Sequence, residues 1–137
     1  MQSRPLISDR TRVTGGSVQS TNLEEKVFRM DKRIRFCGVL DERGKVMSGG
    51  MRPGVKSLEP DEEAERVDLQ VVLTRSMSES AQPYLGRTNY VIIHRESVML
   101  VAMPRQDRKT ILVSTEPSFP LAKVKTLLGI VNKNYPQ

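Results

Sequence analysis

The most reactive side chains of this sequence are its single cysteine, Cys37, and its single histidine, His94. A nucleophilic cysteine needs a neighbouring base and an electropositive setting. A zinc site needs three or four nitrogen, sulfur or oxygen ligands, and no second histidine or cysteine stands at ligand spacing, so the sequence argues against a zinc site of the usual kind in a monomer. We interpret Cys37 as a half-buried structural thiol in a strand and His94 as an exposed residue at a hairpin turn.

The glycine-rich stretch from Gly49 to Lys56 has the glycine spacing of a phosphate-binding loop. A P-loop continues with lysine after its second glycine, whereas Val55 follows Gly54 here. Pro53 also removes a backbone N–H that a phosphate cradle would use. We therefore predict a turn-rich connector, in which Arg52 and Lys56 are candidates for contact with an anion or a partner.

Two further clusters carry charge. The first is acidic and falls in the early turns of a predicted helix: Asp61, Glu62, Glu63, Glu65 and Asp68. Carboxylates in that position usually form a solvated face matched to the helix dipole, and acid–base catalysis would require a cleft that separates their pKa values. The second cluster is a basic loop that we predict as an anion or partner contact: Arg105, Arg108 and Lys109.

Composition limits the remaining functions. The 137 residues suffice for one domain, and the net charge of +6 divides into +6 over 1–56, −4 over 57–78 and +4 over 79–137. An acidic middle and the absence of tryptophan disfavour a uniformly basic nucleic-acid binder. The sequence has no apolar run of about eighteen residues and no secretory signal at its start, so we expect a cytoplasmic protein.

The elements that must position these side chains begin after a polar tail. Residues 1–20 have no apolar period, so we expect a flexible tail followed by a single domain over 21–137. A capping-box pattern at Thr21–Glu24 predicts a helix that ends near Arg33. Alternation then predicts a hairpin over 34–52, and the glycines predict that 49–58 form the loop after it.

A long middle helix is predicted from Pro60, because proline and the acids that follow it favour a helix start. Pro83 and Gly86 bound its end. Its apolar face is wider than one sheet contact requires, which indicates that part of it meets another subunit. That face consists of Val67, Leu69, Val71, Val72, Leu73 and Met77.

Three strand-like runs follow, at Tyr90–Ile93, Val98–Met103 and Thr110–Ser114. Their connections are too short for a parallel crossover, so neighbouring strands must be antiparallel. A last helix is predicted after a cap at Ser118, with its apolar stripe at Leu121, Val124, Leu127, Leu128 and Val131. The predicted fold is α+β, a five-stranded antiparallel sheet in the order α-ββ-α-βββ-α.

That order resembles the roadblock/dynein-light-chain and longin-like domains over residues 21–134. The hairpin Ile34–Val46 is similar to the opening hairpin of that group, and Tyr84–His94 is similar to a segment of uncharacterised archaeal proteins of this architecture. The resemblance implies a homodimer that serves as a scaffold or regulator of small GTPases. Because the group has no shared catalytic motif, the resemblance implies neither catalytic residues nor a cofactor.

Three classes of function remain, and an enzyme ranks below them. The first is the homodimeric interaction module. The second is a small-molecule sensor, because profilin-like and PAS-like sensors share this sheet layout and the seven methionines suit an adaptable pocket. The third is a nucleic-acid binder, which rests on charge alone.

The dimer is expected to use the middle helix and the strand Tyr90–Ile93. In the roadblock-like order this strand lies at a sheet edge, and it carries no proline or charge that would oppose pairing. The predicted interface residues are Leu69, Leu73, Met77, Tyr90 and Ile92.

Overall fold

A computed structural model describes residues 22–135. The first half comprises α1 (Asn22–Met30), β1 (Ile34–Leu40), β2 (Val46–Met51), α2 (Asp61–Met77), the 3-10 turn η4 (Ser78–Ala81) and α3 (Gln82–Leu85). The second half comprises β3 (Val91–His94), β4 (Met99–Pro104), the turn η5 (Gln106–Arg108), β5 (Thr110–Thr115), the turn η6 (Leu121–Lys123) and α4 (Val124–Asn134).

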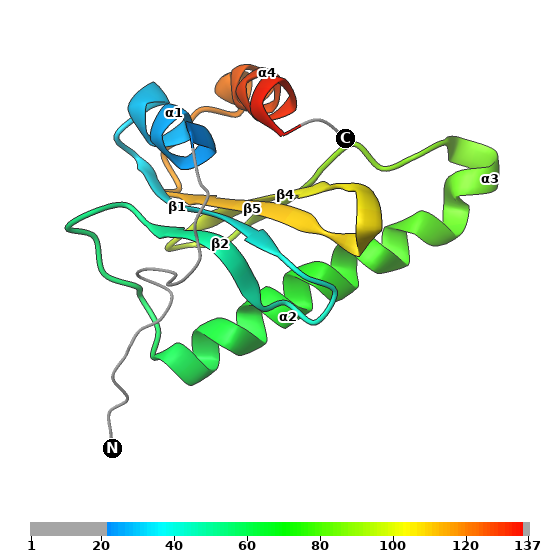
Figure 1. The fold of residues 1–137 in the computed structure, drawn as a ribbon, viewed down its shortest axis with the longest axis horizontal. Coiled ribbons are helices and arrows are strands. Elements are labelled where there is room, and N and C mark those ends of the chain that lie inside the picture. Colours follow the sequence, from blue (N-terminus) through cyan, green and yellow to red (C-terminus); the bar gives the residue numbers. More distant parts are fainter. Residues whose placement is uncertain (1–21, 136–137) are drawn as a thin grey trace.

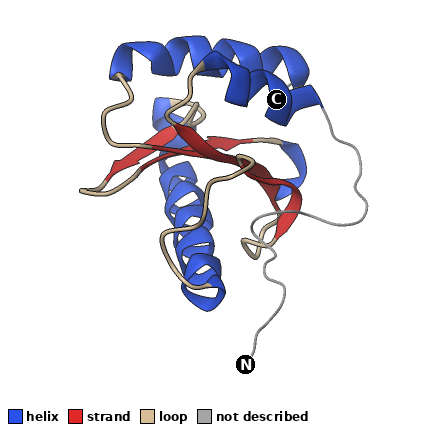
Figure 2. Ribbon diagram, turned by 90° about the vertical axis from the view of Figure 1, so that its left-hand side faces the viewer, coloured by secondary structure: helices blue, strands red, loops and turns tan. Residues whose placement is uncertain are grey.

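The five strands form one antiparallel sheet in the order β2-β1-β5-β4-β3. Helices α1 and α4 lie side by side on one face, and α2 crosses the other face (Figures 1 and 2). The predicted α+β fold with its five-stranded sheet is therefore confirmed, and β3 lies at an edge of the sheet.

Alternating side chains of the strands build a separate apolar core on each face. Cys37 and Val113 pack in the core under α1 and α4, whereas Phe36 and Leu112 pack in the core under α2. The register shifts between Ile34 and Phe36, where two residues of β1 oppose one residue of β5. Such a bulge changes the direction in which the intervening side chain, Arg35, projects.

Strand β2 corrects the predicted loop over 49–58, because Gly49 and Gly50 belong to the strand and the connection begins at Arg52. Gly49 has φ +87° and lies opposite Gly38 in the register. A Cβ atom built on Gly49 would lie 2.2 Å from the Cys37 carbonyl oxygen. Glycine is required here because the two backbones of the hairpin approach each other closely. The glycine-rich pattern predicts a loop at this place, so the function of Gly49 differs from the prediction.

The first helix ends at Met30, before the predicted end near Arg33. The helix ends there because Arg52, which is distant in sequence, binds backbone carbonyls at its C-terminal end. Its guanidinium donates hydrogen bonds to the carbonyls of Phe28 and Asp31, and also to Ile34 in β1. The start of this helix at Thr21 and the predicted tail over 1–20 lie outside the described residues.

The last helix also differs from its prediction at its start. Pro120 and the turn η6 precede it, whereas Ser118 had been predicted as the cap. Val124, Leu127 and Val131 are buried as predicted. Leu121 is exposed, because it falls in the 3-10 turn before the helical stripe begins.

Asp31, in the turn between α1 and β1, joins three segments. Its carboxylate accepts two hydrogen bonds from the Arg33 guanidinium, at 2.9 and 2.7 Å, and lies 2.8 Å from Lys123 Nζ in η6. These bonds to Arg33 hold the pKa of Asp31 well below its usual range, against the opposing effect of burial, and Lys123 lowers it further. The ionised carboxylate therefore stabilises the packing of α4 beside α1.

Asp31→Asn is expected to lower the free energy of unfolding by about 2 kcal/mol at pH 7, because it weakens charge-assisted hydrogen bonds to two cations. Because the pKa of Asp31 is lowered in the folded state, the ionised carboxylate stabilises the fold at pH values above its unfolded-state pKa of about 3.9. That stabilisation is lost progressively as the pH falls below this value. Urea unfolding at pH 7 and at pH 3 should therefore show a difference between variant and wild type that shrinks in acid. The exposed Asp107→Asn serves as control, and a pH-independent difference would contradict this role for Asp31.

A groove between helix α2 and the sheet

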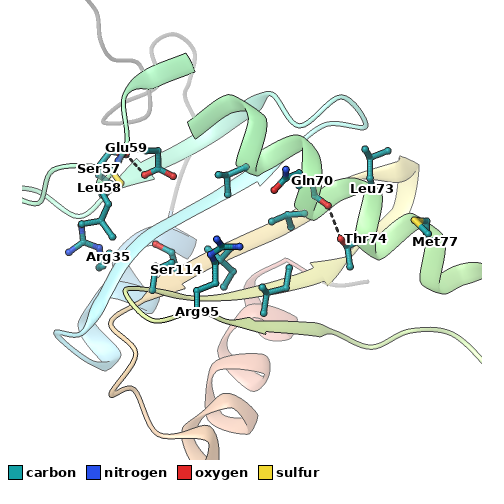
Figure 3. Close-up of a pocket in the computed structure, with 16 residues that line it drawn as sticks. Arg35, Ser57, Leu58, Glu59, Gln70, Leu73, Thr74, Met77, Arg95 and Ser114 are labelled. Carbon is teal, nitrogen blue, oxygen red and sulfur yellow. Dashed lines mark hydrogen bonds between the residues drawn. The ribbon is translucent and has the colours of Figure 1, made fainter. Parts of the chain in front are cut away.

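The α2 face of the sheet contains one row of residues that spans all five strands. The register places Met51, Phe36, Ser114, Leu100 and Ile93 side by side, in that order. A single helix is too narrow to cover this row. The uncovered part forms the floor of a groove of about 630 Å³ (Figure 3).

One wall of the groove is a stripe of α2 at helical spacing: Val67, Gln70, Val71, Thr74 and Met77. The connection before α2 contributes Ser57, Leu58 and Glu59. Arg35, from the bulge in β1, and Arg95, directly after β3, also line the groove. The groove is thus mostly apolar and has two cationic side chains at its margin.

Two predicted interface residues lie at this groove, since Leu73 and Met77 line it and are 51% and 74% exposed. Leu69, one helical turn before Leu73, is 40% exposed and is not among the residues that line the groove. Its backbone lies beside the β1–β2 turn, where a Cβ atom on Gly44 would approach the Leu69 nitrogen at 2.8 Å. Its part in the interface stays a prediction.

The predicted residues of the edge strand divide between the two faces of the sheet. Ile92 packs against the core under α1 and α4, whereas Ile93 and Val91 pack on the α2 side. Tyr90 precedes β3 and lines a shallow hollow with Leu128 and Gly129 of α4. Ile93 is thus the β3 residue that lies in the groove, and the sequence prediction had not selected it.

Strand β3 pairs with β4 on one side only. The Arg95 N–H donates to the Val98 carbonyl at 2.8 Å, which closes the hairpin between the two strands. Hydrogen-bonded and non-hydrogen-bonded pairs alternate along an antiparallel ladder. The backbone N–H and C=O groups of Ile92 and His94 therefore point toward the open edge, where a further strand could pair with them.

No family model and no curated protein matches this chain. Among solved structures, a roadblock/LC7 domain from Streptomyces avermitilis matches with a TM-score of 0.58 and 16% identity, over 81% of this chain and 92% of that one. The gliding protein MglB from Thermus thermophilus matches with a TM-score of 0.61 and 16% identity, over 82% and 87% of the two chains. MglC from Myxococcus xanthus matches with a TM-score of 0.55 and 16% identity, over 82% of this chain and 92% of that one.

The fold is a roadblock fold. These matches confirm the predicted resemblance at the level of architecture. The similarity of Tyr84–His94 to archaeal proteins stays a prediction.

The predicted anion contacts fall at opposite ends of the roadblock sheet. Arg52 and Lys56 follow β2 near the start of β1, whereas the β4–β5 turn lies near Leu40 at the other end of β1. Seven residues of strand separate these ends by about 20 Å. The two groups of cations therefore do not form one patch.

Two of these cations also have internal partners. Arg52 binds three backbone carbonyls, as described above, and its guanidinium lies 5.1 Å from the Phe28 ring centroid. Arg105 is buried and donates to the Tyr135 carbonyl and to Asn132 Oδ1, which ties β4 to the end of α4. Arg108 and Lys109 lie in and after the η5 turn, where Arg108 Nη1 is 3.3 Å from Glu42 Oε1.

Cys37 and His94 are not brought together. Cys37 is fully buried, rather than half-buried as predicted, and desolvation raises the pKa of its thiol far above the usual range. His94 is exposed, and its Nε2 lies 3.2 Å from the Pro117 carbonyl oxygen. Since β5 and β4 stand between β1 and β3, three strand spacings of about 14 Å separate the two residues across the sheet, and His94 lies two residues further along β3 than the row of Cys37.

Within residues 22–135, no three histidine, cysteine, aspartate or glutamate side chains gather as a metal site would require. No helix in the same range is long and apolar enough to cross a membrane.

Proposed function

We propose that this protein is a homodimeric interaction module that acts as a scaffold or regulator of a small GTPase and carries out no catalysis. The observation that carries the proposal is the α2–β3 groove, where exposed apolar residues of a helix lie beside an unpaired edge strand. Proteins seldom leave both features open to solvent, because apolar patches and free strand edges promote association.

A twofold axis at the β3 edge would satisfy both features together. Antiparallel pairing of two β3 strands would join the sheets of two copies through the outward groups of Ile92 and His94. It would also bring the two α2 helices side by side, so that Leu73 and Met77 leave solvent. A contact of this kind is isologous, and a specific one should bury more than about 1,000 Å².

Light scattering on the full chain tests this dimer. A mass of twice 15.5 kDa at micromolar concentration is the expected result. A mass of 15.5 kDa that persists at high micromolar concentration would contradict the proposed dimer.

The GTPase partner rests on the roadblock fold, which the resemblance associates with GTPase scaffolds and regulators. Among the neighbours are a gliding protein, MglB, and an MglB structure with a tetrameric arrangement. Binding of small GTPases from the native cell, each loaded with GDP or with a non-hydrolysable GTP analogue, provides the test. Binding that depends on the nucleotide supports the proposal, and an absence of binding in both states contradicts it.

The groove also gives specific support to a second candidate, a small-molecule sensor. Its volume of about 630 Å³ falls within the range of ligand pockets, and its lining combines many apolar side chains with a few polar ones. This candidate is favoured if the protein is monomeric and is stabilised by a small molecule.

A further inference from the structure

Ser114 is the polar member of the residue row that floors the groove. It is 4% exposed, and its hydroxyl makes no hydrogen bond to any of the described residues. Its neighbours in the row, Phe36 and Leu100, are apolar. Buried hydroxyls in proteins are almost always hydrogen-bonded, so this one lacks the partner that such a group normally has.

Two guanidinium groups border the same groove. The Arg95 side chain makes no hydrogen bond or ion pair with the described residues. Arg35 gives one N–H to the Lys56 carbonyl, at 2.7 Å, and has further donors. Figure 3 shows Arg95 and Ser114 both rising from the sheet into the groove, with Arg35 nearer to Leu58.

The groove has one carboxylate among its lining residues, that of Glu59, and it already accepts a hydrogen bond from the Ser57 hydroxyl at 2.8 Å. The charge that faces the open space near Ser114 is therefore positive. A guanidinium and a hydroxyl donor match a carboxylate, which accepts hydrogen bonds and pairs with arginine in a planar geometry.

Beyond Ser114 and Arg95, the groove is lined mainly by apolar side chains. From Ser114 the floor crosses Leu100 to Ile93, two strand spacings or roughly 10 Å, and Val71 and Met77 form the wall above it. A ligand that fits both parts has an anionic head and an apolar tail.

We propose that the groove binds a small monocarboxylate with an apolar tail. The carboxylate accepts hydrogen bonds from the Ser114 hydroxyl and the Arg95 guanidinium, and the tail lies over Leu100 and Ile93 against α2. The site shares Leu73 and Met77 with the proposed dimer contact. The proposal therefore rests on the proposed function in one respect, that Ser114, Leu100 and Ile93 stay accessible when two α2 helices pair.

Calorimetric titration of the full chain with octanoate tests the site, with acetate and 1-octanol as probes that lack the tail or the charge. Octanoate should bind with a stoichiometry of one per chain and at least about tenfold more tightly than either comparison compound. Arg95→Gln and Ser114→Ala should each weaken octanoate binding by about tenfold. Arg43→Gln, which removes an exposed cation from the β1–β2 turn, should leave it unchanged.

Thermal unfolding without ligand provides an independent readout of Ser114. Because its hydroxyl has no partner, Ser114→Ala should be at least as stable as the wild type while it binds octanoate less well. A clear loss of stability would show that the hydroxyl serves the fold, and would overturn its assignment to a ligand.

Equal affinity for octanoate and 1-octanol, no binding at all, or unchanged binding in Arg95→Gln would also overturn the proposal. Sedimentation of the same samples separates this result from failure of the dimer. A monomeric wild type that binds octanoate contradicts only the proposed dimer. A dimeric wild type that does not bind, beside a monomeric Leu73→Glu variant that does, would show that the second copy fills the groove, and the ligand proposal would fall.

Discussion

Gly49→Ala is expected to lower the free energy of unfolding by at least about 3 kcal/mol, because two costs add. Gly49 has φ +87°, a left-handed conformation that alanine adopts only under strain. Its new methyl group would also lie 2.2 Å from the Cys37 carbonyl oxygen and 2.7 Å from the Gly38 Cα atom. Both neighbours are backbone atoms of the β1–β2 hairpin, so neither can move without disturbing the β1–β2 pairing. Urea unfolding followed by circular dichroism measures the change.

Gly54→Ala is the matched control for this substitution. Gly54 has nearly the same dihedral, φ +84°, but a Cβ atom there would meet nothing within 4 Å. Gly54→Ala should therefore lower the free energy of unfolding by only about 1 kcal/mol, the cost of the backbone strain without a steric clash. Failure of Gly49→Ala to fold would agree with the steric argument, whereas equal losses in the two variants would contradict it.

The second large effect is expected at the proposed dimer contact. Leu73→Glu should raise the dimer dissociation constant at least about 100-fold, because it would replace an apolar contact with two like charges, one from each copy, in a surface that loses water on association. The side chain is half exposed in the single chain, so the variant should keep its fold. Sedimentation equilibrium over a concentration series gives the constant.

Met47→Glu is the matched control for the dimer contact. Met47 is 46% exposed and lies on β2, at the edge of the sheet opposite β3. The Met47→Glu variant loses a similar exposed apolar side chain and gains the same charge, but at a position away from the proposed contact. Its dimer dissociation constant should therefore equal that of the wild type. If both variants dissociate equally, charge in general opposes association, and the contact does not involve α2.

Local patterns in the sequence predicted the order of elements and most of their positions. Helix and strand periods, the acids after Pro60 and the short connections each act over a few residues. Leu73 and Met77 could be selected because their spacing shows an apolar row on the helix. Leu69 belongs to the same row by spacing, and only the three-dimensional structure shows that its backbone lies beside the β1–β2 turn and that it does not line the groove.

The remaining features depend on contacts between distant segments. The glycines of β2 suggested a loop, since the Cys37 carbonyl that requires Gly49 comes from another strand. Arg52 looked available to an anion, whereas its partners are carbonyls of α1 and β1. Ser114 looked like an ordinary strand residue. Only the packing of α2 over the sheet shows that it lines the same groove as Arg95.

Hydrogen exchange of the β3 amides tests most directly whether two copies associate through their β3 edges, because it measures whether the backbone N–H groups of that edge are hydrogen-bonded. The N–H groups of Ile92 and His94 point away from β4, so the single chain leaves them exposed. If two β3 strands pair, these amides should exchange slowly in the wild type at high concentration and quickly in Leu73→Glu. Fast exchange of both amides in a wild-type sample that is dimeric by sedimentation would contradict the account, since the copies would then associate through another surface.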